Sequence, residues 1–137
     1  MEVFTCNDNL TDIFTCIYDA WDYAIHNDGH ESIRLEKEPI SQLSLFDNYH
    51  HVNGDRDKST KVESSIKRKI SMKAYSQIAY AAMSHEPECL NVIYNYLRLG
   101  FKIGAQVTED LKEPVVVRMV ELSRNVTNEA HFSREFC

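Results

Sequence analysis

Between positions 10 and 25, apolar residues recur at helical spacing, and this pattern constrains the fold more than any other feature of the chain. The apolar positions are Leu10, Ile13, Phe14, Ile17, Trp21, Ala24 and Ile25. Residues three and four positions apart lie on one face of an α-helix, so the pattern predicts an amphipathic helix with this face buried. Asn9 is a typical helix cap, and Asn27 and Gly29 are typical stop residues. We therefore predict a helix that begins after Asn9 and ends near His26.

Three short segments outside this helix have the composition of β-strands. Residues 2–6 are rich in strand-forming side chains, residues 33–36 alternate apolar and polar, and residues 48–52 precede an Asn-Gly turn. The segment 39–46 is predicted to be a loop. Because the strands are short and few, we expect a small sheet packed against the first helix.

From residue 55 to the end of the chain, the apolar pattern is helical throughout. The first predicted helix begins near Asp55 or Asp57, and the second is capped by Ser71. The third is opened by Glu86 and Pro87, and Gly100 and Gly104 bracket its end. A short helical turn over residues 106–111 and a last helix from Pro114 follow. The helix capped by Ser71 is expected to bury Tyr75, Ile78, Ala79, Ala82 and Met83.

These elements place the chain in the α+β class, predominantly α, with about five helices and a small N-terminal β-sheet of two or three short strands. The chain has 137 residues, of which 43% are hydrophobic, and this is sufficient to fill one core. We therefore predict a single domain over residues 1–137, with a strand-helix-strand region over residues 1–54 and a helical region over residues 55–137.

The composition excludes several classes of protein. The start of the chain lacks the basic and apolar regions of a signal peptide, and no apolar run approaches the roughly 20 residues that span a bilayer. The sequence contains no GxSxG, HExxH or P-loop motif. The cysteines show neither CxxC spacing nor the clustering of a metal site; they are Cys6, Cys16, Cys89 and Cys137. We expect a cytoplasmic protein with free thiols, without membrane contact, metal or cofactor.

Charge is distributed unevenly along the chain, whose formal net charge is −6. Residues 1–55 are strongly acidic, whereas residues 56–73 carry seven basic and two acidic side chains. On a helix Lys58, Lys61, Ser65 and Arg68 would share one face, with Lys67, Lys69 and Lys73 alongside. Such a stripe could follow the phosphates of a nucleic acid, with a tyrosine such as Tyr75 adding stacking. The alternative interpretation is a solvated helix face that balances the acidic third.

A second polar stripe lies on the last predicted helix. Its members, at positions i, i+3, i+7 and i+10, are Glu121, Arg124, Asn128 and His131, with Glu129 beside them. These residue types could bind a phosphate or a base edge, or hold a group that transfers protons. The alternative is an ordinary exposed helix end with a histidine near its C-terminus.

Four stretches of the chain resemble a known family in their order and spacing. They are residues 10–21, residues 64–71 (SSIKRKIS), residues 93–101 (IYNYLRLGF) and residues 120–131 (VELSRNVTNEAH). They resemble a bacterial family of DNA-metabolism and DNA-repair proteins that is encoded beside a radical-SAM protein of DNA repair or modification. A similar domain is fused to some uracil-DNA glycosylases. The resemblance covers nearly the whole chain and implies DNA and a radical-SAM protein as partners.

The family pattern continues considerably further past the position of His131. The resemblance therefore implies that this chain corresponds to the N-terminal part of a longer architecture. It carries no established chemistry that could be transferred residue by residue, so it implies a cellular context and no catalytic residue.

Three functional hypotheses follow. The favoured one is a DNA-repair accessory without catalytic activity of its own, which binds nucleic acid or docks on a radical-SAM partner through the basic stretch and the last helix. The second is an enzyme acting on a nucleobase or nucleotide, with Glu129 and His131 as acid/base groups and Arg124 holding a phosphate. The third is a structural protein–protein adaptor whose basic helix meets an acidic partner. The sequence does not fix the oligomeric state.

Overall fold

The computed structural model describes residues 1–27, 29–40 and 42–136, with side chains up to residue 127. The chain divides into two compact units, Met1–Ser64 and Ser65–Cys137, each of which is described by itself. The unit boundary lies inside one helix, whereas the sequence placed a regional boundary at residue 54, where that helix is about to begin.

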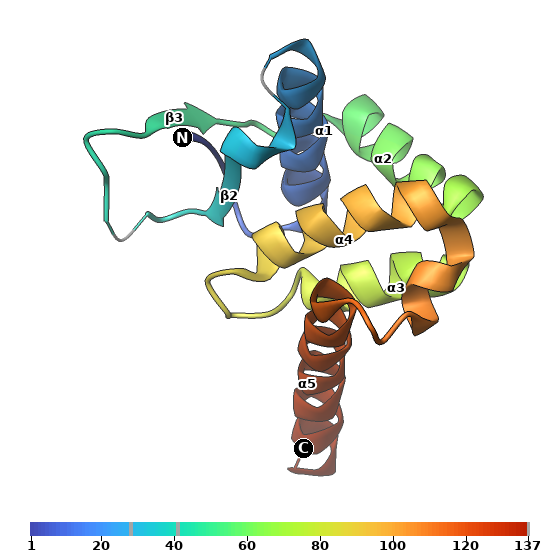
Figure 1. The fold of residues 1–137 in the computed structure, drawn as a ribbon. Helices are drawn as coiled ribbons and strands as arrows, with labels where there is room; N and C mark the ends of the chain where they lie inside the picture. Colours follow the sequence, from blue (N-terminus) through green and yellow to red (C-terminus); the bar gives the residue numbers. More distant parts are fainter. Residues whose placement is uncertain (28, 41, 137) are drawn as a thin grey trace. The chain divides into compact units, whose positions relative to one another are not determined.

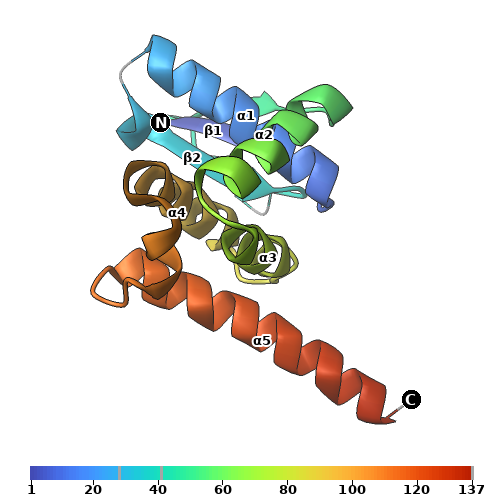
Figure 2. The same cartoon turned by 90° about the vertical axis from the view of Figure 1, so that its right-hand side faces the viewer.

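The first unit is a three-stranded parallel sheet with a helix on one face (Figure 1). Its elements are β1 (Glu2–Cys6), α1 (Leu10–His26), the short 3₁₀ helix η1 (His30–Ser32), β2 (Ile33–Lys37), β3 (Asn48–His51) and the beginning of α2 (Arg56–Lys69). The strand order is β2-β1-β3, and Phe4 on the central strand is paired with Leu35 and His50. Figure 2 shows α1 lying along β1 and β2, and Phe4 meets Tyr23 of α1 edge-on at 5.7 Å between ring centroids.

Local sequence explains where α1 begins and which face it buries. The Asn9 side chain accepts a hydrogen bond of 2.9 Å from the Asp12 backbone N–H, which satisfies a donor that the first helical turn leaves open. Its buried apolar residues are Ile13, Phe14, Cys16, Ile17, Ala20 and Ala24. The prediction that Ile25 is buried is wrong, because Ile25 lies on the flank of this buried arc in the last turn and is 63% exposed.

The second unit is helical. It contains the end of α2, α3 (Met72–Ala81), α4 (Cys89–Ile103), the 3₁₀ helix η2 (Gly104–Glu109) and α5 (Pro114–Phe136). Ser71 caps α3 as predicted, accepting a hydrogen bond of 3.0 Å from Ala74 N–H. Helix α5 packs along α3 and α4 (Figure 2). The buried core of this unit is built from Ile66, Ile78, Leu90, Ile93, Tyr96, Leu97, Met119 and Leu122.

Three details of the helical prediction are corrected. Helix α4 begins at Cys89, two residues after Pro87, because residues 87–88 form a turn. Gly100 lies inside α4 and does not mark its end: it allows a close approach of Ile70, whose Cδ1 would stand 2.7 Å from a Cβ at this position. Met83 follows the end of α3 and is 54% exposed, so it does not belong to the buried face.

The fold class itself is confirmed. The described residues form an α+β structure that is mainly α, with five α-helices and a small parallel sheet near the N-terminus. The predicted strands and helices are all present, and their bounds differ from the predicted ones by few residues. The predicted free thiols are also found at Cys6, Cys16 and Cys89, which are buried, whereas Cys137 lies outside the described residues.

Candidate nucleic-acid interface

The first basic residues of α2 belong to the first unit and make contacts within it. Lys58 Nζ lies 2.8 Å from Asp19 Oδ1 and 5.5 Å from the ring centroid of Tyr18. Hydrogen bonding to the Asp19 carboxylate raises the pKa of Lys58. The ammonium of Lys61, whose side chain is exposed, lies 6.0 Å from the same tyrosine ring. Both cations therefore sit over α1, and Lys58 is already paired with a carboxylate.

Polar contacts also fix the start of α2 against α1. The Asp55 side chain accepts a hydrogen bond of 3.0 Å from Lys58 N–H and so caps the helix. The buried Thr15 hydroxyl accepts a hydrogen bond of 2.9 Å from Asp55 N–H and lies 2.7 Å from the Thr11 carbonyl oxygen, to which it donates. This end of α2 is thus held by hydrogen bonds and one ion pair.

The basic residues at the other end of α2 belong to the second unit and are arranged differently. Lys67 Nζ lies 4.5 Å from the centroid of the Tyr75 ring, a cation–π contact. Arg68 and Lys69 are exposed, and Lys73 near the start of α3 is 3.8 Å from the exposed carboxylate of Glu109. Where side chains are described, up to residue 127, no carboxylate forms an ion pair with Arg68 or Lys69. Ser65 is half-buried at the beginning of this part.

Apolar packing positions this second group of cations. Ile66 is fully buried and Ile70 is 6% exposed, so their face of the helix is fixed against the core. The helix ends at Lys69, and α3 begins at Met72 after a break of two residues, the second of which is its cap Ser71. Cations in the last helical turn are also favoured by the negative end of the helix dipole, which alone could account for their presence there. The exposure of Arg68 and Lys69 to solvent leaves these two side chains available to an anion as well.

The structure therefore separates the predicted basic stripe into two parts. Lys58 and Lys61 lie over Tyr18 in the first unit, while the second unit brings together Lys67, Arg68, Lys69, Lys73 and Tyr75. We call residues 67–73 the basic turn. Lysine and arginine side chains beside a tyrosine ring are suited to phosphate contacts and to stacking on a base or sugar.

The second predicted stripe is only partly described. Arg124 is exposed on α5, whereas the side chains of Asn128, Glu129 and His131 lie outside the described residues. Glu121 has a local partner, because its carboxylate is 3.1 Å from Arg118. Arg118 in turn contacts Glu86 at 3.7 Å and forms a short ion pair with Glu88, whose pKa it lowers. The described part of the stripe thus contains a structural ion-pair network and one exposed arginine.

The carboxyl edge of the sheet holds a further polar group that the sequence did not predict. His51 Nδ1 contacts the Glu38 carboxylate, which also accepts a hydrogen bond of 2.7 Å from Thr5 Oγ1. His51 Nε2 lies 3.0 Å from Asn53 Oδ1. Both ring nitrogens therefore face acceptors, which raises the pKa of His51, with the Glu38 contact as the main cause. On the other face, His50 stacks on Phe4 and contacts Glu2 at 2.5 Å.

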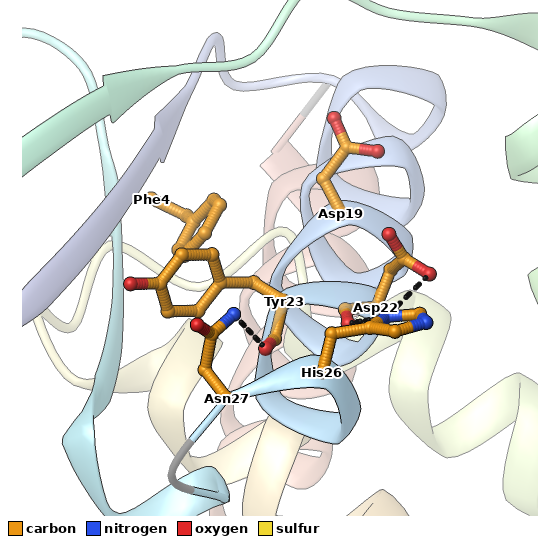
Figure 3. A pocket seen from close by; sticks show the side chains of 6 residues that line it. All are labelled: Phe4, Asp19, Asp22, Tyr23, His26 and Asn27. Atoms are coloured by element: carbon orange, nitrogen blue, oxygen red, sulfur yellow. Dashed lines mark hydrogen bonds and ion pairs between the residues drawn. The ribbon is translucent and has the colours of Figure 1, made fainter.

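A shallow hollow of about 310 Å³ lies beside the C-terminal half of α1. Figure 3 shows the side chains around it, which are those of Phe4, Asp19, Asp22, Tyr23, His26 and Asn27. Its polar groups are used locally: His26 Nδ1 lies 2.8 Å from the Asp22 carbonyl oxygen, and Asn27 donates to the Tyr23 carbonyl at 2.8 Å. These bonds finish the helix end, and the Asp19 carboxylate beside them is paired with Lys58.

Among the described residues, no group of three or more His, Cys, Asp or Glu residues is placed to hold a metal ion. In the same part of the chain, no helix combines the length and the apolar character needed to cross a membrane.

Sequence reasoning missed one conspicuous feature, the apolar side chains of the loop between β2 and β3. Leu43, Leu45 and Phe46 are 74%, 99% and 91% exposed. The sequence carried the signal, because three large apolar residues within a predicted loop have no strand or helix face on which to be buried.

Comparison of the chain with protein-family models, with curated proteins and with solved structures finds no match. A function for this protein therefore has to be argued from its own residues. The basic turn is the best candidate among them, because it combines exposed charge with a fixed backbone.

Proposed function

We propose that this protein is an accessory factor of DNA metabolism that binds nucleic-acid phosphates through the basic turn. One observation carries the proposal: four cations lie within seven residues, and Arg68 and Lys69 are exposed, although the chain as a whole has a net charge of −6. Long-range attraction of nucleic acid to the whole surface is disfavoured by that net charge. Binding must then be local, and the basic turn is the place where positive charge is concentrated.

The chemistry of the basic turn favours binding without sequence preference. Lysine and arginine contacts to phosphates position a protein on a nucleic acid, whereas reading a sequence requires side chains that reach base edges in a groove. The basic turn offers ammonium and guanidinium groups with a half-buried tyrosine, Tyr75, which lies beneath Lys67. We therefore expect contacts to the backbone of the nucleic acid and little discrimination among bases.

The partner in this proposal comes from the family resemblance. A radical-SAM DNA-repair protein would supply the chemistry, and this chain would present DNA to it or dock on it. Arg124 on α5 is an exposed cation of the second stripe and could extend such a surface within the second unit. No contact of the described residues favours the enzymatic alternative, and the adaptor alternative uses the same cations against an acidic protein patch.

The test is a fluorescence-anisotropy titration of a 20-base-pair duplex and a 20-nucleotide single strand at several salt concentrations. If four phosphates are neutralised, duplex affinity should fall about 100-fold between 50 and 200 mM salt, because log K falls with log salt with a slope of about −0.9 per phosphate contact. The variant Arg68→Glu/Lys69→Glu should lose about two units of that slope and most of the affinity.

The matched control is Arg56→Glu/Lys112→Glu, which changes the net charge equally at two exposed positions outside the basic turn. It should bind nearly as well as the unmodified chain. Equal weakening in both variants would mean that net charge alone is responsible and would contradict the proposal. Binding of neither nucleic acid by the folded chain would favour the adaptor instead.

A further inference from the structure

The loop between β2 and β3 presents an uncharged apolar segment in an acidic protein. Residues 42–46 read Gln-Leu-Ser-Leu-Phe, and all five are exposed. A single exposed leucine is ordinary on a protein surface, whereas three large exposed apolar side chains within four consecutive residues are not. The exposed fractions of Leu45 and Phe46 exceed nine-tenths, so these side chains receive almost no cover from their own unit.

The backbone is held from Ser44 to the C-terminal end of this segment, although the side chains are exposed. The Ser44 backbone N–H donates to the Tyr49 hydroxyl at 3.0 Å, and the Phe46 N–H donates to Ser44 Oγ at 3.3 Å. Immediately after the segment, the Asp47 carboxylate is 3.3 Å from the amino group of Met1 and 3.1 Å from Arg34. The adjoining backbone is therefore held at the sheet, while the leucine and phenylalanine side chains remain outside it.

The order of side chains in residues 42–46 indicates which groups a partner must provide. Gln42 brings an amide that both donates and accepts, Leu43 brings an aliphatic group, and Leu45 and Phe46 bring two adjacent bulky groups. Large apolar side chains that enter fitted pockets provide most of the affinity in interfaces of this size. A groove with a polar rim and two apolar pockets accommodates this order, and the lack of charge in the segment means that no buried ion must be neutralised.

We propose that residues 42–46 are a docking peptide for a partner protein that has such a groove and remains on DNA. The location of the partner rests on the proposed function, whereas the peptide chemistry rests on the loop alone. Sliding clamps, the ring proteins that encircle DNA during replication, combine both properties, since each subunit carries an apolar groove that receives short client peptides. A clamp would hold this chain near DNA even if its basic turn bound phosphates weakly, because linked contacts reinforce each other.

The experiment measures binding of the full chain to a purified bacterial sliding clamp by calorimetry, in the absence of DNA. Dissociation constants in the micromolar range are expected for so short a peptide, on the order of 10⁻⁶ to 10⁻⁵ M. The variant Leu45→Ala/Phe46→Ala should bind at least about tenfold more weakly, and it should remain folded because both side chains are exposed. A synthetic peptide of residues 40–48 should compete with the full chain.

The matched control is Met72→Ala/Leu111→Ala, which removes two exposed apolar side chains elsewhere and should leave clamp binding unchanged. Absence of binding, or equal binding by the Leu45→Ala/Phe46→Ala variant, would overturn the proposal. Self-association of the chain that this variant abolishes, with no clamp binding, would make a second copy the occupant and would also overturn it. The Arg68→Glu/Lys69→Glu variant should still bind the clamp, so failure of the DNA-binding proposal would be seen separately.

Discussion

The two ends of α2 carry the same kinds of cationic side chain but are held in different ways. In the first unit the helix start is fixed by Thr15, Asp55 and Asp19, and its Lys58 is paired with a carboxylate. In the second unit the helix end is fixed by Ile66 and Ile70, and its Arg68 and Lys69 are exposed to solvent. Where apolar packing holds the backbone, these two charges remain available to a ligand.

The largest expected effect concerns the apolar anchor of the basic turn. Ile70→Ala should lower the free energy of unfolding by about 2–5 kcal/mol, because it removes buried methyl groups and leaves a cavity beside Gly100. Urea denaturation followed by circular dichroism measures this. Met72→Ala, at a 59% exposed position two residues later, should change it by less than about 0.5 kcal/mol. Similar losses of stability from both substitutions would mean that apolar packing of Ile70 is not what holds this end of α2.

A smaller loss is expected at the polar end. Thr15→Val keeps the shape of a buried side chain but removes the hydroxyl that accepts from Asp55 N–H. Leaving that donor without a partner should cost about 1–3 kcal/mol, measured in the same urea titration. The control is Thr60→Val on the exposed surface of α2. If the two valine variants were equally stable, the hydroxyl would not be what holds the start of α2.

The sequence predicts the features that depend on local patterns, but not those that depend on contacts between distant residues. The helices were predictable because their apolar spacing and caps, such as Asn9 and Ser71, are local. The parallel arrangement was not, since it depends on pairing between β1 and strands far along the chain, and both faces of β1 are buried. The central strand therefore shows no alternation of apolar and polar residues from which a pairing partner could be inferred.

The candidate site was predictable by position but not by availability. Charge counting identified residues 56–73 as basic, yet it could not tell that Lys58 pairs with Asp19, which lies 39 residues earlier. Likewise, the pattern of stop residues could not show that Gly100 allows a close contact with Ile70 and does not end the helix. Such contacts depend on tertiary structure, and they decide which of several equivalent lysines is free to bind.

A still smaller effect is expected when one cation from either end of α2 is replaced. Lys58→Met keeps the apolar stem but removes the pairing with Asp19, and should cost at most about 1 kcal/mol because the pair is partly exposed. Its effect on DNA affinity should be less than about twofold. Arg68→Met should leave stability unchanged and reduce the salt slope of duplex binding by about 0.9. If Lys58→Met weakened DNA binding more than Arg68→Met, the division of the basic stripe would be wrong.

The smallest effect concerns the dependence of the first unit on pH through the contact of His51 with Glu38. Since the pKa of His51 is raised from 6.5, its contribution is fully present below pH 6.5 and is lost as pH rises through the folded-state value. Since the pKa of Glu38 is lowered from 4.5, its contribution is present above pH 4.5 and is lost as pH falls through its folded-state value. The contact is therefore strongest between pH 4.5 and 6.5.

NMR titration of the His51 ring protons measures this contact directly. In the Glu38→Gln variant the pKa of His51 should fall back toward 6.5, because the main cause of its rise is removed. Glu36→Gln, two residues earlier on β2 and next to Arg34, should leave it in place. An unchanged pKa of His51 in Glu38→Gln would show that this pair does not form in solution. The first unit would then depend less on polar contacts than the hydrogen bonds at the start of α2 indicate.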